Sequence, residues 1–296
     1  SLNAAAYANM ERELDDVLRE FVGYEAAYQR QMLITAAPVV SVAGVSTDMV
    51  YAAAMRRPFQ GVLLRSVWPD LSDSRMKLIR RTIAQGFVES RTTAQIVRDL
   101  RGTKVQGYAD GLVNRSRREV EAVVRTALWH YAGVTQDSVM EANSDLVKAV
   151  KWVSTLDART SEQCRLRDGL LYEPVSHKPI GHKVPWGAGP GRLHWNCRST
   201  QTPITKSWRE LGVDMDEVPA GTRASMDGQV PAETTYLEWL GKQPAGVQDE
   251  VLGPTRAKLY RDGKLPMDRM YGDKGQWLSI DQLRARDAAA FKRAGM

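Results

Sequence analysis

The 296-residue chain has few of the residues on which several classes of protein depend. Its only two cysteines, Cys164 and Cys197, exclude the multi-disulfide framework of small secreted domains and are typical of intracellular proteins. No run of about 18 apolar residues occurs, so we expect no transmembrane helix. The first residues lack the basic and then apolar pattern of a signal peptide, and there is no internal repeat or low-complexity tail. The apolar share of 43% is nevertheless ordinary for a globular protein, and the length suits one large domain or two smaller ones.

The net charge of +6 is unevenly distributed along the chain. Residues 56–125 contain 15 Lys and Arg against 7 Asp and Glu, a surplus of eight, so the rest of the chain is negative by two. A surplus concentrated in one segment indicates contact with a polyanion or an acidic protein, and a solvated helix surface is the alternative. The residues predicted to contact DNA or an acidic protein are Arg80, Arg81, Arg115, Arg117 and Arg118.

The spacing of apolar residues predicts a helical first half. Residues 3–36 read as one long helix, which Pro38 ends, with an apolar seam in steps of three and four that can pair with another helix of this chain or with a partner protein. The seam consists of Tyr7, Met10, Leu14, Val17, Phe21, Tyr24, Tyr28 and Met32. Capping residues then predict helices over about 47–57, 73–89 and 94–101, and a long helix follows over about 114–142.

Two strand-like runs, 152–156 and 200–204, enclose a loop rich in proline and glycine. Short helices are predicted after it, over about 206–210, 233–240, 248–260 and 282–294, the third of them split by Gly253-Pro254. The fold class expected is therefore α+β, mainly α. We predict four segments: a long N-terminal helix and linker (1–45), a basic helical body (46–145), a Cys/His β module (146–210) and a helical C-terminal extension (211–296).

The stretch from Lys151 to Pro203, which contains the loop, carries both cysteines and three of the four histidines. Cys164, His194 and Cys197, with His182 or His177 as a fourth ligand, have the donor types that zinc prefers, although no second ligand lies near Cys164 in the sequence. A Cys164–Cys197 disulfide is the second interpretation, and in the chain-entropy model it would contribute about 3–4 kcal/mol. Two buried free thiols are the third. A catalytic Cys–His pair or a metal-dependent nuclease would also need an orienting carboxylate.

The acidic residues of this segment have a simpler interpretation as structural elements. Asp157 and Arg159 can form a charge-assisted pair at the end of the first strand, and Asp168-Gly169 is a hairpin-turn signal. Either aspartate would also be the nearest carboxylate for a catalytic Cys–His pair.

The order of these motifs resembles the phage head-morphogenesis family, the Mu F-like group of minor head proteins. The resemblance rests on Asp157-x-Arg159-Thr160, Cys164, Asp168-Gly169 and His194-x-Asn196-Cys197-Arg198, and extends over about residues 90–290. The helix that carries Arg125-Thr126 also looks like its counterpart in the family. Many members have a cysteine after the arginine of the last motif, where this chain has Ser199, and this difference weakens the zinc interpretation.

The resemblance implies a low-copy protein of the capsid interior, made in the host cytoplasm and incorporated into the virion. Its expected partners are the portal protein and the major capsid or scaffold protein, with packaged double-stranded DNA as a further contact and no membrane during assembly. The family pattern implies no catalytic activity, and zinc is the one cofactor that the sequence indicates. A metal-dependent nuclease and a free DNA-binding protein are the alternative functions.

Overall fold

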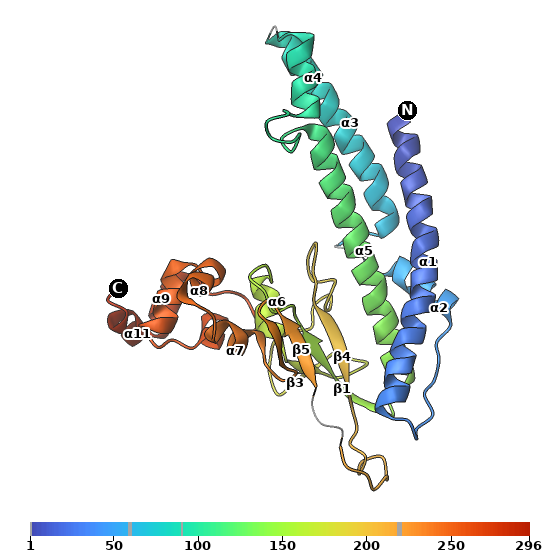
Figure 1. Cartoon of the computed structure of the whole chain (residues 1–296), viewed down its shortest axis with the longest axis vertical. Coiled ribbons are helices and arrows are strands. Elements are labelled where there is room, and N and C mark those ends of the chain that lie inside the picture. Colours follow the sequence, from blue (N-terminus) through green and yellow to red (C-terminus); the bar gives the residue numbers. More distant parts are fainter. Residues whose placement is uncertain (1, 59–60, 90, 218–220) are drawn as a thin grey trace. The chain divides into compact units, whose positions relative to one another are not determined.

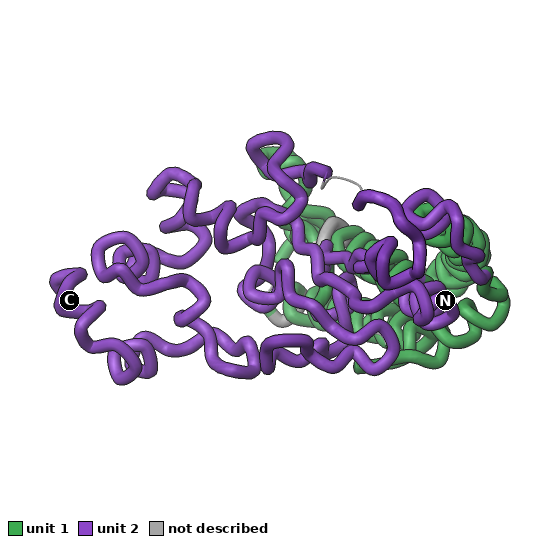
Figure 2. The backbone as a smooth tube through the Cα atoms, turned by 90° about the horizontal axis from the view of Figure 1, so that it is seen from below, with its two compact units in different colours: residues 1–32, 44–135, 194–196 green, residues 33–43, 136–193, 197–296 purple. Residues whose placement is uncertain are grey.

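The computed structural model describes residues 2–58, 61–89, 91–217 and 221–296, with the backbone alone for residues 2–4, 87–88 and 112–116. The fold is α+β and mainly α, as predicted. The chain forms two compact units (Figure 2). The helical unit comprises residues 1–32, 44–135 and 194–196, and the mixed unit comprises residues 33–43, 136–193 and 197–296. The division near residue 135 lies ten residues before the predicted start of the Cys/His β module.

The helical unit is built from α1 (Leu2–Ala36), α2 (Thr47–Arg56), α3 (Leu64–Val88), α4 (Thr93–Arg101) and α5 (Leu112–Ala142), although the ends of α1 and α5 belong to the mixed unit. Figure 1 shows α3 running antiparallel to α5. The side chains of α1, α2, α3 and α5 form one core, which includes Leu18, Tyr51, Trp68 and Ala127. All five predicted helices are present.

Local signals explain most of these helix boundaries. The hydroxyl of Ser46 accepts a hydrogen bond from the backbone of Met49, and Thr92 forms a reciprocal capping box with Gln95. The predicted start of α3 was wrong by about nine residues, because the helix begins at Leu64 and continues through Pro69. Burial of Trp68 in the core stabilises this first part of α3, which no capping residue marks.

The predicted seam of α1 was wrong along most of its length. Tyr7 and Leu14 are buried, but beyond them the buried apolar side chains are Leu18, Val22, Ala26 and Leu33. The other seam residues remain at least partly exposed: Met10, Val17, Phe21, Tyr24, Tyr28 and Met32. Apolar residues occur on more than one face of this helix, so the spacing alone did not identify the face that packs.

The mixed unit contains a four-stranded antiparallel sheet in the order β3-β2-β1-β4. Its strands are β1 (Val147–Val153), β2 (Leu171–Tyr172), β3 (Pro179–Ile180) and β4 (Thr200–Thr205). β4 matches the strand predicted over 200–204, whereas β1 begins five residues before the strand predicted over 152–156 and shares only Trp152 and Val153 with it. The two strands pair with each other, with Trp152 opposite Gln201. The sheet therefore brings together the two ends of the Pro/Gly-rich loop.

Several elements of the mixed unit were not predicted: the short strands β2 and β3, a 3-10 helix at Met267–Met270, the short helix α6 (Glu162–Arg167) and the hairpin of β5 (Thr222–Ser225) and β6 (Gly228–Pro231). The hairpin turn expected at Asp168-Gly169 was also wrong. Asp168 instead ends α6, and Gly169 turns the chain into β2 with a φ of +84°. Glycine suits this position because other residues rarely adopt a positive φ.

The C-terminal part is a set of short helices: α7 (Tyr236–Gly241), α8 (Ala245–Leu252), α9 (Pro254–Arg261), the 3-10 helix η1 (Met267–Met270), α10 (Ile280–Arg286) and α11 (Ala288–Arg293). The helix predicted over 206–210 is a turn, and the one predicted over 282–294 is broken at Asp287, whose carboxylate caps α11 at Ala290. Two apolar clusters hold these helices, one centred on Trp239 and one on Phe291. Among the described residues, no helix combines the length and the hydropathy that membrane crossing requires.

Candidate metal site

The structure brings Cys164 of α6 close to Cys197, which precedes β4. Both side chains are buried, and their sulfur atoms lie 3.7 Å apart. This separation is much longer than the bond of about 2.05 Å in a disulfide, and the two cysteines are not covalently joined. His194, which is half-buried, completes a group whose ligand atoms all lie within 4.8 Å of one another. We call Cys164, His194 and Cys197 the Cys/His cluster; it can bind a metal ion.

The orientation of His194 suits it to this role. Its Nδ1 lies 2.9 Å from the backbone oxygen of Trp195. When Nδ1 carries the proton and donates it to that oxygen, Nε2 has the lone pair that a metal ion requires.

The other two histidines of the segment do not join the cluster. The Nε2 of His182 lies 2.9 Å from the backbone oxygen of Leu171, and its Nδ1 accepts a hydrogen bond from the backbone of Val184. The ring of His177 stacks on Trp186 at 4.5 Å. The prediction of His182 as a fourth ligand is therefore not supported by its position, and the described part of the chain supplies three ligands.

The environment of the Cys164 thiol favours its protonated form unless a cation is present. The hydrogen bond with Cys197 and the burial of the side chain both raise the pKa of the Cys164 thiol. A bound metal ion reverses this preference, because it deprotonates the thiols that it coordinates.

A bidentate ion pair between Asp157 and Arg198 lies next to Cys197 in the sequence. The two carboxylate oxygens of Asp157 accept hydrogen bonds from the two terminal nitrogens of Arg198, at 2.6 and 2.7 Å. Burial opposes the charged form of Asp157, but the hydrogen bonds and charge of Arg198 outweigh it and lower the pKa. The predicted pairing of Asp157 with Arg159 was wrong: Asp157 accepts the backbone N–H of Arg159, whose side chain is exposed. The pair of Asp157 with Arg198 thus joins the two ends of the loop. The hydroxyl of Thr160, at the same end as Asp157, donates to the backbone oxygen of Thr155 at 2.6 Å and lies 3.2 Å from the Asp157 carboxylate.

Asp168 is the second aspartate that joins distant segments of the mixed unit, and its side chain is completely buried. Its carboxylate accepts hydrogen bonds from the backbone of Ser154 at 2.6 Å and of Tyr236 at 2.7 Å, and from both terminal nitrogens of Arg223 at 3.0 Å. Burial raises the pKa of Asp168, and the hydrogen bonds and charge of Arg223 partly offset this effect. Sequence reasoning missed Arg223, because it lies 55 residues away in a hairpin that was not predicted.

Asn196 connects the final motif to the long helix of the same unit. Its backbone is left-handed, with a φ of +57°, a conformation that asparagine tolerates better than most residues. Its N–H donates to the hydroxyl of Thr126 at 3.0 Å. The Arg125-Thr126 pair quoted for the resemblance thus contributes its threonine to the motif.

The basic residues predicted for DNA or protein contact lie on the helical unit. Arg80 and Arg81 are exposed on α3, and Arg117 and Arg118 are exposed on α5. Because the two helices are antiparallel, these residues lie toward the same end, where α4 is also found (Figure 1). Arg117 forms an ion pair with Glu121 at 2.9 Å. The side chain of Arg115 lies outside the described residues.

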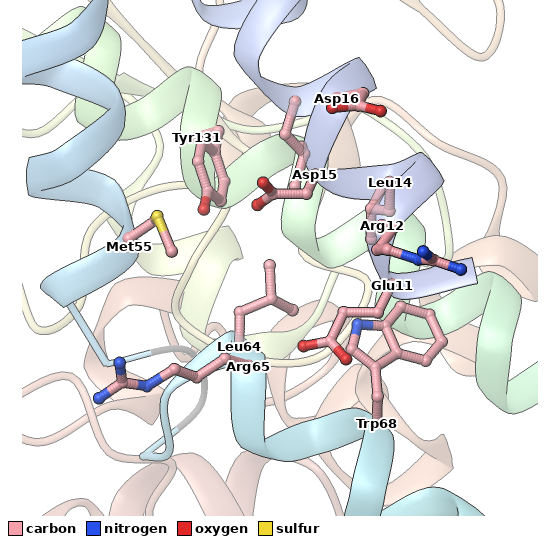
Figure 3. Close-up of a pocket in the computed structure, with 11 residues that line it drawn as sticks. Glu11, Arg12, Leu14, Asp15, Asp16, Met55, Leu64, Arg65, Trp68 and Tyr131 are labelled. Atoms are coloured by element: carbon pink, nitrogen blue, oxygen red, sulfur yellow. The ribbon is translucent and has the colours of Figure 1, made fainter. Parts of the chain in front are cut away.

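The helical unit also contains a pocket of about 380 Å³ that the sequence did not indicate (Figure 3). Apolar side chains, including Leu14 and Trp68, line it together with charged residues of both signs. Asp15 accepts a hydrogen bond from Tyr51, and Arg12 and Arg65 lie at the same pocket. A lining of mixed charge selects no ligand class, so the Cys/His cluster is the stronger candidate site.

Comparison of the chain with protein-family models, with curated proteins and with solved structures finds no match.

Proposed function

We propose that this chain is a phage minor head protein, an internal capsid component that associates with the portal and with the major capsid or scaffold protein. Its role would lie in procapsid assembly and in DNA packaging or ejection. The observation that carries the proposal is the ordered motif from Asp157 to Arg198, which resembles that family. The contacts of its members support treating the motif as one structural module: Asp157 binds Arg198, and Cys164 lies against Cys197.

In this proposal the Cys/His cluster is a structural zinc clasp. Two thiolates bound tetrahedrally to zinc at about 2.3 Å each lie about 3.8 Å apart, close to the separation found here. The soft sulfur donors and the imidazole also match the preferences of zinc. The ion would close the Pro/Gly-rich loop, which has few apolar residues with which to pack.

Metal analysis of the purified protein tests the clasp. We expect one zinc per chain, lost in Cys197→Ser and His194→Ala, and a lower thermal midpoint after treatment with a strong chelator. His182→Ala is the matched control, since it removes a nearby imidazole outside the cluster and should leave zinc bound. Absence of metal with two titratable thiols would contradict the zinc clasp, and a mass lower by two hydrogens would indicate a disulfide instead.

The basic end of the helical unit is the proposed contact for packaged DNA or for an acidic portal surface. Reversing Arg80 and Arg81 to Glu, or Arg117 and Arg118 to Glu, should weaken binding to duplex DNA and reduce its dependence on salt. A control pair with the same charge change is Arg159→Glu with Arg209→Glu, both exposed on the mixed unit. Equal effects of the two kinds of pair would show that only net charge matters.

Assembly itself is tested in particles made from the genome that encodes the chain. Quantitative mass spectrometry of purified particles should find the protein at a few copies for each shell, and its disruption should reduce the yield of infectious particles. If the protein is absent from particles, the proposal fails, whatever the outcome of the metal analysis.

One observation favours a second candidate, a metal-dependent nuclease. The cluster has three protein ligands, the number found in catalytic zinc sites that hold a water in the fourth position. This alternative predicts cleavage of plasmid DNA by the zinc-loaded protein and its loss in His194→Ala. A free DNA-binding protein, in contrast, would bind duplex DNA with strong salt dependence and would not enter particles.

A further inference from the structure

Ser199 lies at the Cys/His cluster, two residues after Cys197 in the segment that leads into β4. Its side chain is buried, and its hydroxyl forms a hydrogen bond with the sulfur of Cys164. The sulfur of Cys197 lies 3.7 Å from the same atom. Cys197 and Ser199 therefore point to the same side of the chain, as residues two apart do where the backbone is extended. The cluster thus has a buried oxygen beside its two sulfur atoms.

A second buried serine, Ser154, determines where the hydroxyl proton of Ser199 points. The hydroxyl oxygens of Ser154 and Ser199 lie 3.1 Å apart, and Ser154 donates its own proton to the backbone oxygen of Cys164 at 2.9 Å. A serine hydroxyl has one proton and two lone pairs. Because the proton of Ser154 is already used, Ser199 is the donor in the contact between the two serines. Ser154 also accepts the indole N–H of Trp152 at 3.1 Å, so its proton and both of its lone pairs are used.

This assignment leaves the oxygen of Ser199 as an acceptor toward the cluster. Its proton points to Ser154, so a lone pair faces the sulfur of Cys164, and the thiol of Cys164 is the donor in that hydrogen bond. A metal ion deprotonates the thiols that it coordinates. When such an ion replaces the proton of Cys164, the lone pair of Ser199 is directed at the ion.

The distances suit a centre with four ligands. Structural zinc sites are tetrahedral, with sulfur at about 2.3 Å and oxygen at about 2.0–2.2 Å, so a thiolate and an oxygen on one ion lie about 3.6 Å apart. This value is comparable with the 3.7 Å between the sulfur atoms of Cys164 and Cys197. Ser161 also forms a hydrogen bond with the sulfur of Cys164, but it is the half-buried N-cap residue of α6 and lies on the other segment from Cys197.

From this geometry we infer that Ser199 is the fourth ligand of the metal centre, and that its oxygen makes the bound zinc exchangeable. The inference rests on the zinc clasp of the proposed function. Zinc prefers soft thiolates to a neutral oxygen, so this centre should release the ion more readily than a site of three cysteines and one histidine. The hydroxyl would also fill the position that a catalytic zinc site keeps for water, which separates the clasp from the nuclease alternative.

Substitution of cobalt(II) for zinc in the full chain tests the inference, because the absorbance of a cobalt centre reports its geometry and the number of thiolates bound. We expect a tetrahedral centre with two thiolates in the wild type and with three in Ser199→Cys. The dissociation constant for zinc should fall at least about tenfold in Ser199→Cys, and a chelating dye should remove zinc from it more slowly. Ser199→Ala should raise the dissociation constant by about tenfold.

Ser161→Cys is the matched control, since it adds a thiol at the other hydroxyl that contacts Cys164 and should leave two thiolates on cobalt. Circular dichroism checks that each variant is folded. If the wild type binds cobalt and neither Ser199 variant changes the spectrum or the affinity, the clasp stands and the inference alone is overturned. A third thiolate in Ser161→Cys but not in Ser199→Cys would also overturn it. A wild type that binds neither cobalt nor zinc would overturn both the clasp and the inference.

Discussion

Replacement of Arg223 by alanine should strongly destabilise the mixed unit. Arg223 is the counter-charge of Asp168, whose side chain is completely buried while that of Arg223 is 15% exposed. Its guanidinium also donates to the backbone oxygens of Ser154 and Thr234. Removing one member of a buried ion pair typically costs about 3–5 kcal/mol, because the remaining charge stays buried without compensation.

The expected loss depends on pH. The pKa of Asp168 is already raised by burial, and the loss of Arg223 raises it further. The carboxyl of the variant can therefore take up a proton and reduce the cost. We expect a loss of about 3 kcal/mol or more at pH 8, and a smaller one at pH 5.

Urea denaturation followed by tryptophan fluorescence measures this effect, because Trp152 and Trp239 are buried in the same unit. Arg159→Ala is the control, since it removes the same kind of side chain from an exposed position of the same unit and should change stability by less than about 0.5 kcal/mol. If Arg223→Ala and Arg159→Ala prove equally stable, the assignment of Asp168 as a charged anchor is refuted.

Three further predictions concern neighbouring residues of the same unit. Gly169→Ala should lower the free energy of unfolding by about 1–3 kcal/mol, because the residue has a positive φ and the added methyl group would lie 2.9 Å from Thr235 Cγ2. Gly246→Ala is the control in the same urea assay, and it should be neutral or stabilising because there is open space around that position. Arg198→Ala should cost about 1 kcal/mol or less at neutral pH, since the pair with Asp157 is partly exposed. The pKa of Asp157 is lower in the folded state than in the unfolded chain, where it is about 3.9. Its ionised form therefore stabilises the folded state above a pH of about 3.9, and this stabilisation is lost as the pH falls through the pKa of the folded state. The urea denaturation curves of Arg198→Ala and wild type should then converge in acid. Burial raises the pKa of Tyr236 to about 12, so the folded state should lose stability as the pH rises from about 10 to about 12. Phenolate absorbance of the folded protein should show this tyrosine ionising only near pH 12. Ionisation near a pH of about 10 would contradict the burial of Tyr236.

The sequence was sufficient for features that depend on neighbouring residues. Helix ends were predicted where a capping side chain reaches a backbone group three residues on, as at Ser46 and Thr92. The proximity of His194 to Cys197 follows from their spacing, and β4 follows from the composition of its segment, whereas only the last two residues of β1 were predicted. The donor types in the Cys/His cluster were therefore visible in the sequence, although its third member, Cys164, lies 30 residues before His194.

Tertiary structure alone decided the contacts between distant segments. Asp157 selects Arg198, 41 residues away, over its neighbour Arg159, because the pairing of β1 with β4 brings the two ends of the loop together. Asp168 meets Arg223 only because the β5–β6 hairpin folds onto this region. His182 has the right chemistry for the cluster but binds backbone groups elsewhere.

Helix α1 shows the same division within a single element. The sequence by itself determined that residues 2–36 are helical, because propensity and periodicity act over one or two turns. It did not determine which apolar face would pack, since that choice depends on the shape of the core offered by α2, α3 and α5. Local interactions thus set the elements of this protein, and long-range packing set the faces, the ion pairs and the grouping of the candidate metal ligands.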